Sequence, residues 1–248
     1  MTSTEPLQFF VYVIESPSAP DLYHRRSECD VVKQAIALDR IPCEARLVIS
    51  REAFLASIRI GLPEEMARFP GRLPLLHISA HGDDDGIQLS NGEVISWPEM
   101  RDILRPVNDA LHGALILCLS CCRGYSGIRM AMFTEDASLP FFALVGSPQS
   151  PTWADTAVGF ATFYHLVAKG ARITDAVTAM RAASGLDEWW VTTAAEQREG
   201  FLSFVTRSDV GDAQRELAED ATTVAPDDLA KMTALEAGGH GTATTASN

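Results

Sequence analysis

Apolar runs typical of buried β-strands alternate along the chain with segments of helical periodicity. Strands are predicted at residues 7–14, 43–49, 73–79, 87–89, 93–95, 114–119, 141–145 and 201–205. Helices are predicted at residues 21–38, 51–69 (broken near Gly61), 156–169 and 174–183, and one more begins at Ser96. Continuous apolar strands separated by helices indicate a parallel sheet covered on both faces. The predicted fold class is an α/β three-layer α/β/α sandwich around a mainly parallel sheet of about six strands.

The end of the chain differs in composition from the rest. Residues 207–248 contain three basic and eight acidic residues and are rich in Ala, Thr and Gly. Such a segment buries too little apolar area to offset its ordering entropy. We therefore expect one α/β domain over residues 1–206, followed by an acidic, flexible tail over residues 207–248.

Charge and cysteine content exclude several classes of protein. The formal net charge is −13, and an acidic surface repels phosphate, so neither nucleic acid nor an anionic membrane is expected as a partner. No apolar run approaches the roughly 20 residues of a membrane-spanning helix. The start of the chain lacks the features of a signal peptide, which favours a cytoplasmic location. An odd number of cysteines, five in all, argues against a disulfide framework.

Candidate chemistry follows two of the predicted strands. Ala80-His81-Gly82 comes after residues 73–79, and Ser120-Cys121-Cys122-Arg123-Gly124 comes after residues 114–119. Ends of neighbouring strands lie roughly 5 Å apart, which would bring a histidine and a thiol together. A cysteine nucleophile needs a proton-transfer partner, and a glycine lets backbone approach a substrate. These residues therefore indicate acyl transfer.

The two motifs resemble those of caspase-like cysteine peptidases, and within them the CHAT type in its bacterial stand-alone form. The motif pair is LLHISAHG, ending in His-Gly, and LILCLSCCRG, ending in small-Cys-x-x-Gly. Further similarity extends over GIQLSNGEVISWPEM, FFALVGS, TAVGFATFYHLVAKG, DAVTAMRAAS and FLSFV. The resemblance covers about residues 73 to 205. It implies a caspase-like fold, with residues 1–206 as the peptidase domain.

The resemblance also implies roles for individual residues. His81 corresponds to the catalytic histidine and Cys121 to the nucleophile, which would form a thioester with the substrate. The backbone N–H groups of Gly82 and Cys121 correspond to the donors that hold the oxyanion. No cofactor or metal is implied.

One position departs from the family pattern. A Trp-x-x-x-Asp motif in the family, aligned without gaps, falls on Gln149 and Trp153. That aspartate helps relatives to bind a basic substrate residue, whereas here Trp153 takes its place and Asp155 follows two residues later. Trp153 and Asp155 are therefore the substrate-binding candidates, and a preference for Arg or Lys is not expected.

Several residues have a competing interpretation. Cys122 competes with Cys121 as the nucleophile, because the motif alignment is good to about one residue, whereas Cys118 lies within a strand and is expected to be buried. His77 and His81 are spaced H-x-x-x-H, but on a strand four residues span about 13 Å, so His77 is interpreted as structural. The acidic run Asp83–Asp85 is interpreted as a solvated loop rather than a calcium site.

The resemblance implies a cysteine endopeptidase with a His81/Cys121 dyad. It further implies an effector protease in a bacterial antiviral defence or cell-death module, with a protein substrate and a sensor protein that activates it. One alternative is a catalytically idle caspase-like module that acts as a protein-binding adaptor. Another is a flavodoxin-like ligand-binding domain, against which the glycine-free loop at residues 15–20 counts.

Overall fold

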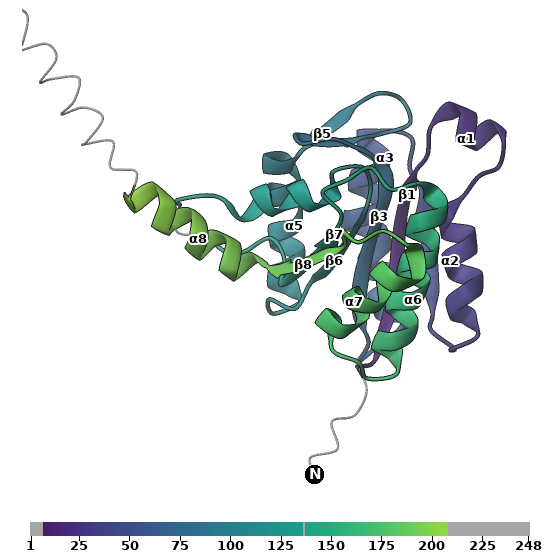
Figure 1. The fold of residues 1–248 in the computed structure, drawn as a ribbon. Helices are drawn as coiled ribbons and strands as arrows, with labels where there is room; N and C mark the ends of the chain where they lie inside the picture. Colours follow the sequence, from purple (N-terminus) through teal and green to yellow (C-terminus); the bar gives the residue numbers. More distant parts are fainter. Residues whose placement is uncertain (1–6, 136, 208–248) are drawn as a thin grey trace, which may run out of the picture. The chain divides into compact units, whose positions relative to one another are not determined.

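The computed structural model describes residues 7–135 and 137–207 (Figure 1). Eight strands form one sheet: β1 (Phe9–Ser16), β2 (Cys43–Leu47), β3 (Leu73–Gly82), β4 (Gly86–Gln88), β5 (Val94–Ser96), β6 (Ile116–Ser120), β7 (Ala143–Gly146) and β8 (Trp190–Thr193). The helices are α1 (Ala19–Tyr23), α2 (Glu28–Ala37), α3 (Arg51–Ala56), α4 (Leu62–Arg68), α5 (Trp97–Ala110), α6 (Trp153–Ala168), α7 (Ile173–Ser184) and α8 (Ala194–Arg207). A π-helical turn, Ser57–Gly61, joins α3 to α4, and a 3₁₀ segment, Gly124–Ala131, follows β6.

The strands follow the order β2-β1-β3-β6-β7-β8. All neighbours on this path are parallel except β7 and β8, and the β4–β5 hairpin continues from the end of β3. Every residue of β1 and β6 is buried, as expected for strands covered on both faces. The predicted fold class is therefore confirmed.

Helices cover both faces of this sheet (Figure 1). On one face, α3, α4 and α5 pack against residues such as Tyr12, Leu76 and Leu117. On the other face, α2, α6 and α7 pack against residues such as Val11, Leu75 and Ile116. Because consecutive side chains of a strand point to opposite faces, each central strand contributes to both cores.

Two predicted helices are divided, one in a way that the sequence analysis missed and the other near Gly61, where a break was predicted. The segment 21–38 forms α1, which ends at Tyr23, and α2, which Ser27 caps, its Oγ accepting from Asp30 N at 3.1 Å. The break in segment 51–69 is the π turn, where Ser57 O accepts from Leu62 N–H and, at 2.8 Å, from the hydroxyl of Tyr12. A side chain inserted into the helix ladder in this way is a known cause of such distortions.

The predicted last strand at residues 201–205 is wrong. These residues belong to α8, and the last strand is β8, which precedes that helix. Thr193 Oγ1 accepts from Glu196 N at 3.2 Å, and Glu196 Oε2 accepts from Thr193 N at 2.9 Å. This capping box starts α8, and its T-x-x-E signature outweighs the strand preference of the apolar run that follows.

The predicted division into residues 1–206 and a flexible tail stays a prediction, because residues 208–248 lie outside the described part of the chain. The compact unit that contains the sheet ends at Leu202. Within residues 7–135 and 137–207, no helix has both the length and the apolar character needed to cross a bilayer.

Candidate active site

The candidate motifs lie at neighbouring strand ends. Strand β3 pairs in parallel with β6, and Ser79 is the register partner of Ser120. His81 lies two residues after Ser79, and Cys121 lies one residue after Ser120. Both line a cavity of about 290 Å³ at the carboxyl edge of the sheet, together with Ala80, Ser120, Cys122, Pro151, Thr152, Trp153 and Thr156. The sequence prediction that the two strands are neighbours is confirmed.

His81 is exposed and held at the mouth of this cavity. Its backbone remains in the sheet, because β3 continues to pair with β4 through His81 and Gln88. Its ring meets the Trp153 ring edge to face, with 6.3 Å between the ring centroids. Trp153 is the first residue of α6, so the start of that helix provides one wall of the cavity. A histidine placed in this way can exchange protons with groups in the cavity.

The Cys121 thiol lies between two glycines. A β-carbon placed on Gly82 would be 3.1 Å from Cys121 Sγ, and one placed on Gly124 would be 3.2 Å from it. The same β-carbon on Gly82 would lie only 2.7 Å from the carbonyl oxygen of Cys122. No larger residue fits at Gly82 without displacing backbone, which gives this glycine a packing reason in addition to its predicted role with the oxyanion.

Cys121 is buried, with 4% of its surface exposed, and belongs to the apolar cluster under α5. Burial raises the pKa of the Cys121 thiol well above its usual range, and negative charge on Cys122, Glu28 and Asp83 raises it further. The thiol is therefore neutral in this conformation. A thiol must ionise before it can attack a carbonyl, so Cys121 needs an additional change in its surroundings.

The other cysteines are placed differently. Cys122 also lines the cavity and is half-buried, so it stays a competitor for the nucleophile role. Cys118 is fully buried, as expected, and burial raises its pKa to about 12.

The second substrate-binding candidate, Asp155, is engaged elsewhere. Its Oδ2 accepts from Thr152 N at 2.9 Å and from Thr152 Oγ1 at 2.7 Å, which completes a capping box at the start of α6. Asp155 is not among the residues that line the cavity, whereas Trp153 is. The structure thus brings Trp153 to His81 and Cys121 and leaves Asp155 at the helix cap.

The acidic run after His81 stabilises the turn that follows β3. Asp83 Oδ1 accepts from Asp85 N at 2.8 Å and from Gly86 N at 3.0 Å. Asp84 accepts from Ser126 Oγ at 2.8 Å, and Asp85 lies 3.2 Å from an Arg129 nitrogen. Each carboxylate has a partner within the turn or in the 3₁₀ segment, and none of the three lines the cavity.

A buried carboxylate that the sequence analysis missed lies beneath the site. Glu28, at the start of α2, accepts from Ser79 Oγ at 2.7 Å and from Ser120 Oγ at 2.6 Å. It thereby joins the two strand ends that carry His81 and Cys121. Burial alone would raise the pKa of Glu28, but interactions with His77, Ser120 and Ser79 outweigh burial and lower it. A negative charge is therefore held in the core directly under the site.

His77 extends this polar cluster into the core, which agrees with its interpretation as structural. It is fully buried, and its Nδ1 lies 2.8 Å from the Tyr164 hydroxyl. Its Nε2 lies 3.7 Å from Glu28 Oε2 and has no hydrogen-bond partner among the described residues. The same part of the chain contains no group of three His, Cys, Asp or Glu side chains arranged to hold a metal ion.

Known proteins resemble this chain only in structure, and only at low sequence identity. No protein-family profile and no curated protein sequence matches the chain. Among solved structures, the chain is similar to the crystal structure of the Arg-specific cysteine proteinase gingipain R, with a TM-score of 0.45 and 12% identity over 76% of this chain and 48% of the other. A complex of the pro- and mature domains of Porphyromonas gingivalis RgpB gives a TM-score of 0.44 and 11% identity over 74% and 47%. The chain thus spans about half the length of these structures, and at this degree of likeness they decide nothing about its chemistry.

Proposed function

We propose that this chain is a cysteine endopeptidase in which His81 and Cys121 form the catalytic dyad. The observation that carries the proposal is the placement of both residues on one cavity, at the ends of the paired strands β3 and β6. The motif resemblance to CHAT-type caspase-like peptidases supports the same assignment. Gly82 supports it further, because its close approach to Cys121 Sγ leaves room for backbone but not for a side chain.

The proposed reaction is acyl transfer to the thiol. His81 takes the proton of the Cys121 thiol, and the resulting thiolate attacks the carbonyl carbon of the scissile peptide bond and forms a C–S bond. The oxyanion that develops is held by the N–H groups of Gly82 and Cys121. His81 gives its proton to the leaving amine as the C–N bond breaks, and water then hydrolyses the thioester.

The proposal includes activation by a partner protein. Cys121 is 4% exposed, and burial raises its pKa, so the resting thiol is a poor nucleophile. A sensor that shifts the loop carrying Gly124 would expose the sulfur to His81. Following the motif resemblance, we further propose a cytoplasmic effector protease in a bacterial antiviral defence or cell-death module, acting on a protein substrate.

The burial of Cys121 also favours a second candidate function, that of a protein-binding module without catalytic activity. A catalytically idle module that binds a partner needs no exposed thiol, and Cys121 packs in the apolar cluster under α5. In that case His81 and Cys121 would be remnants, and replacing them would leave partner binding unchanged.

Probe labelling decides between the two functions. We expect an acyloxymethyl-ketone probe to label the wild-type chain and the Cys122→Ala variant, but not Cys121→Ala or His81→Ala. Peptide cleavage is measured on the same four proteins, with and without cell extract as a source of the activator. Labelling or cleavage that survives intact in Cys121→Ala would remove this cysteine from the mechanism. Absence of labelling in all four proteins under both conditions would favour the idle module.

A further inference from the structure

A groove lies beside the catalytic cavity, between the turn that precedes α2 and the start of α6. Its volume is about 460 Å³. Its lining consists of Arg25, Arg26, Ser27, Glu28, Val31, Trp153, Ala154, Ala157 and Val158. Trp153 lines both this groove and the catalytic cavity, so one side chain separates the two. A polypeptide bound at the dyad can therefore reach the groove by passing Trp153.

One guanidinium that lines the groove has no ion-pair partner among the described residues. Arg26 Nε lies 3.6 Å from Asp21 and is thus paired. The Glu28 carboxylate is occupied by Ser79 and Ser120. Arg25 is exposed, and within residues 7–135 and 137–207 no carboxylate lies within ion-pair distance of its guanidinium. Arg25 is therefore free to pair with a ligand.

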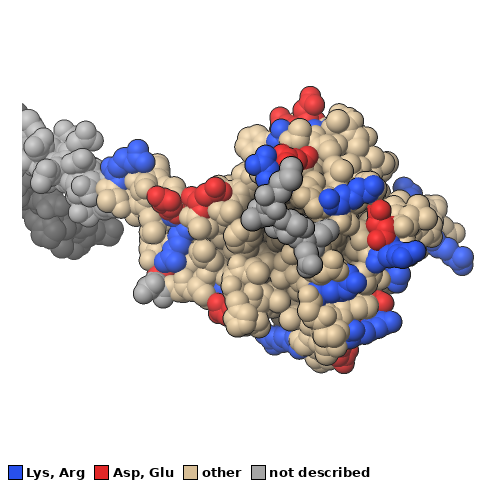
Figure 2. All heavy atoms as spheres, turned by 90° about the horizontal axis from the view of Figure 1, so that it is seen from below, with Lys and Arg blue, Asp and Glu red and all other residues tan. Residues whose placement is uncertain are grey.

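This charge is opposite in sign to that of the protein as a whole. The formal net charge of the chain is −13, and the face shown in Figure 2 carries both acidic and basic side chains, whereas the exposed charged side chains of the groove are two arginines, Arg25 and Arg26. Local basic charge on an acidic protein attracts acidic ligands selectively, because the rest of the surface repels them.

The remaining walls of the groove are apolar. Val31 on α2 and Val158 on α6 are 54% and 47% exposed, which is high for valine. Ala154 and Ala157 of α6 also line the groove. Apolar walls and one guanidinium without an ion-pair partner suit a side chain with a short aliphatic stem and a terminal carboxylate.

We propose that this groove is a substrate subsite that binds an Asp or Glu side chain of the protein substrate, with Arg25 pairing with the carboxylate. The inference rests on the proposed peptidase function. The His81 and Trp153 rings are 6.3 Å apart, a distance that an extended peptide covers in about two residues. The acidic residue therefore lies about two or more positions from the scissile bond and is not the residue that is cleaved.

Matched peptides test the proposal on the full chain in its activated form. Each pair of peptides differs only by Asp or Asn at one position, two to four residues to either side of the scissile bond. We expect the wild-type chain to cleave the Asp member about tenfold or more faster in kcat/KM at one of these positions, since a charge-assisted bond contributes about 1.5–3 kcal/mol. In Arg25→Gln the ratio should fall to about one.

Arg40→Gln is the control variant, because Arg40 has the same unusual backbone and lines neither cavity. The φ angles of Arg25 and Arg40 are 53° and 58°, so both substitutions meet the same local constraint. The Asp/Asn ratio in Arg40→Gln should equal that of the wild type. A wild-type ratio near one at every position, or an equal loss in both variants, would overturn the subsite.

A binding measurement separates failure of the subsite from failure of the peptidase proposal. The Cys121→Ala chain is titrated with fluorescent Asp and Asn peptides and followed by anisotropy. Tighter binding of the Asp peptide, lost when Arg25→Gln is added, supports the groove even if no cleavage is observed. Equal binding of the two peptides overturns it, whatever the wild-type chain cleaves.

Discussion

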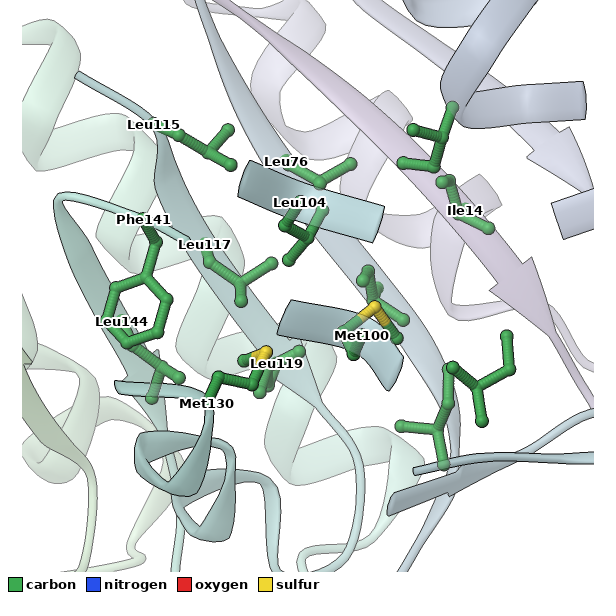
Figure 3. Close-up of a cluster of buried hydrophobic side chains, with 14 of the residues drawn as sticks. Ile14, Leu76, Met100, Leu104, Leu115, Leu117, Leu119, Met130, Phe141 and Leu144 are labelled. Carbon is green, nitrogen blue, oxygen red and sulfur yellow. The ribbon is translucent and has the colours of Figure 1, made fainter. Parts of the chain in front are cut away.

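The two faces of the central sheet differ in the side chains that they bury. The face under α3, α4 and α5 is a mainly apolar cluster that includes Leu76, Leu117 and Leu119 (Figure 3), and its Tyr12 hydroxyl donates to the Ser57 carbonyl at the π turn. The face under α2, α6 and α7 contains a buried glutamate and a buried histidine, with the Tyr164 hydroxyl next to the histidine. The difference teaches that the buried ionisable groups beneath the candidate site, Glu28 and His77, belong to the second face. Apolar packing needs no partner, whereas each buried polar group requires one.

Both candidate residues lie where these faces meet at the edge of the sheet. Cys121 belongs to the apolar cluster, whereas His81 packs against Trp153 of α6 on the other side. The Cys121 thiol thus lies in apolar surroundings, whereas its proposed proton partner His81 is exposed. The proposed activation would move Cys121 from the first environment to the second.

The largest effect is expected on the apolar face. Leu117 is fully buried there, and Leu117→Ala should lower the free energy of unfolding by about 2–5 kcal/mol, because the cavity it leaves is only partly refilled. Urea denaturation measures this loss. Leu38→Ala, at a site that is 89% exposed, is the control and should change stability by less than about 0.5 kcal/mol. A loss below about 1 kcal/mol for Leu117→Ala would show that this face is loosely packed.

On the face under α2, α6 and α7, replacing Glu28 should lower the free energy of unfolding by less than replacing Leu117. Glu28→Gln keeps the shape but replaces a charged acceptor of two serine hydroxyls, so we expect a loss of about 1–3 kcal/mol in the same assay. Glu52→Gln, in the exposed first turn of α3, controls for the helix dipole. Equal stabilities for the two variants would contradict the buried network.

The same carboxylate predicts a pH dependence. Because the pKa of Glu28 is lowered in the folded state, its stabilising contribution is complete above the ordinary glutamate pKa of about 4.3 and is lost as the pH falls through the folded value. The free energy of unfolding should therefore fall less steeply below about pH 4.3 in Glu28→Gln than in the wild type. Parallel curves for the two proteins would mean that Glu28 is not ionised in the folded state.

A smaller effect is expected on the choice of the residue before the scissile bond. Among the described residues, no carboxylate lines the cavity that holds His81 and Cys121, and Asp155 caps α6. A guanidinium buried there would lack a partner, so a peptide library should show no more than about tenfold preference for Arg or Lys over aliphatic side chains. Strong selection for Arg or Lys, abolished in Asp155→Asn, would show that this carboxylate reaches the substrate after all.

The smallest effect on stability is expected from a truncation that leaves the residues of both faces of the sheet in place. Deletion of residues 210–248 removes an acidic segment poor in large apolar side chains. The melting temperature should change by less than about 10 °C, since 1 kcal/mol shifts a domain of this size by roughly 2–4 °C. A larger drop, measured by calorimetry at matched protein concentration, would show that the segment contributes to the folded core.

Most of the strands, and the placement of His81 and Cys121 on one cavity, could be predicted because local sequence carries the signal. Strand β3 is an apolar run, and a parallel sheet places its functional groups at the carboxyl ends of its strands. Residues 201–205 were misassigned because a short apolar run fits a strand and a helix equally well, and the capping box at Thr193 decides between them.

Glu28 could not be found in this way. Its partner Ser79 lies 51 residues away in the sequence, and its other partner Ser120 lies 92 residues away. The only local signal was polar residues inside apolar strands, His77 and Ser79 in β3 and Ser120 in β6. Such residues indicate that a buried partner exists, but three-dimensional packing alone identifies it.

The two glycines around Cys121 have a consequence for the lifetime of the resting protein. Oxidation by peroxide requires a thiolate and access for the oxidant, and a buried neutral thiol offers neither. Gly82 and Gly124 enclose the Cys121 sulfur, so the half-buried Cys122 would be oxidised first. Under the proposed function, the resting chain would accumulate in a cell under oxidative stress with the Cys121 sulfur still reduced, and activation would then expose it.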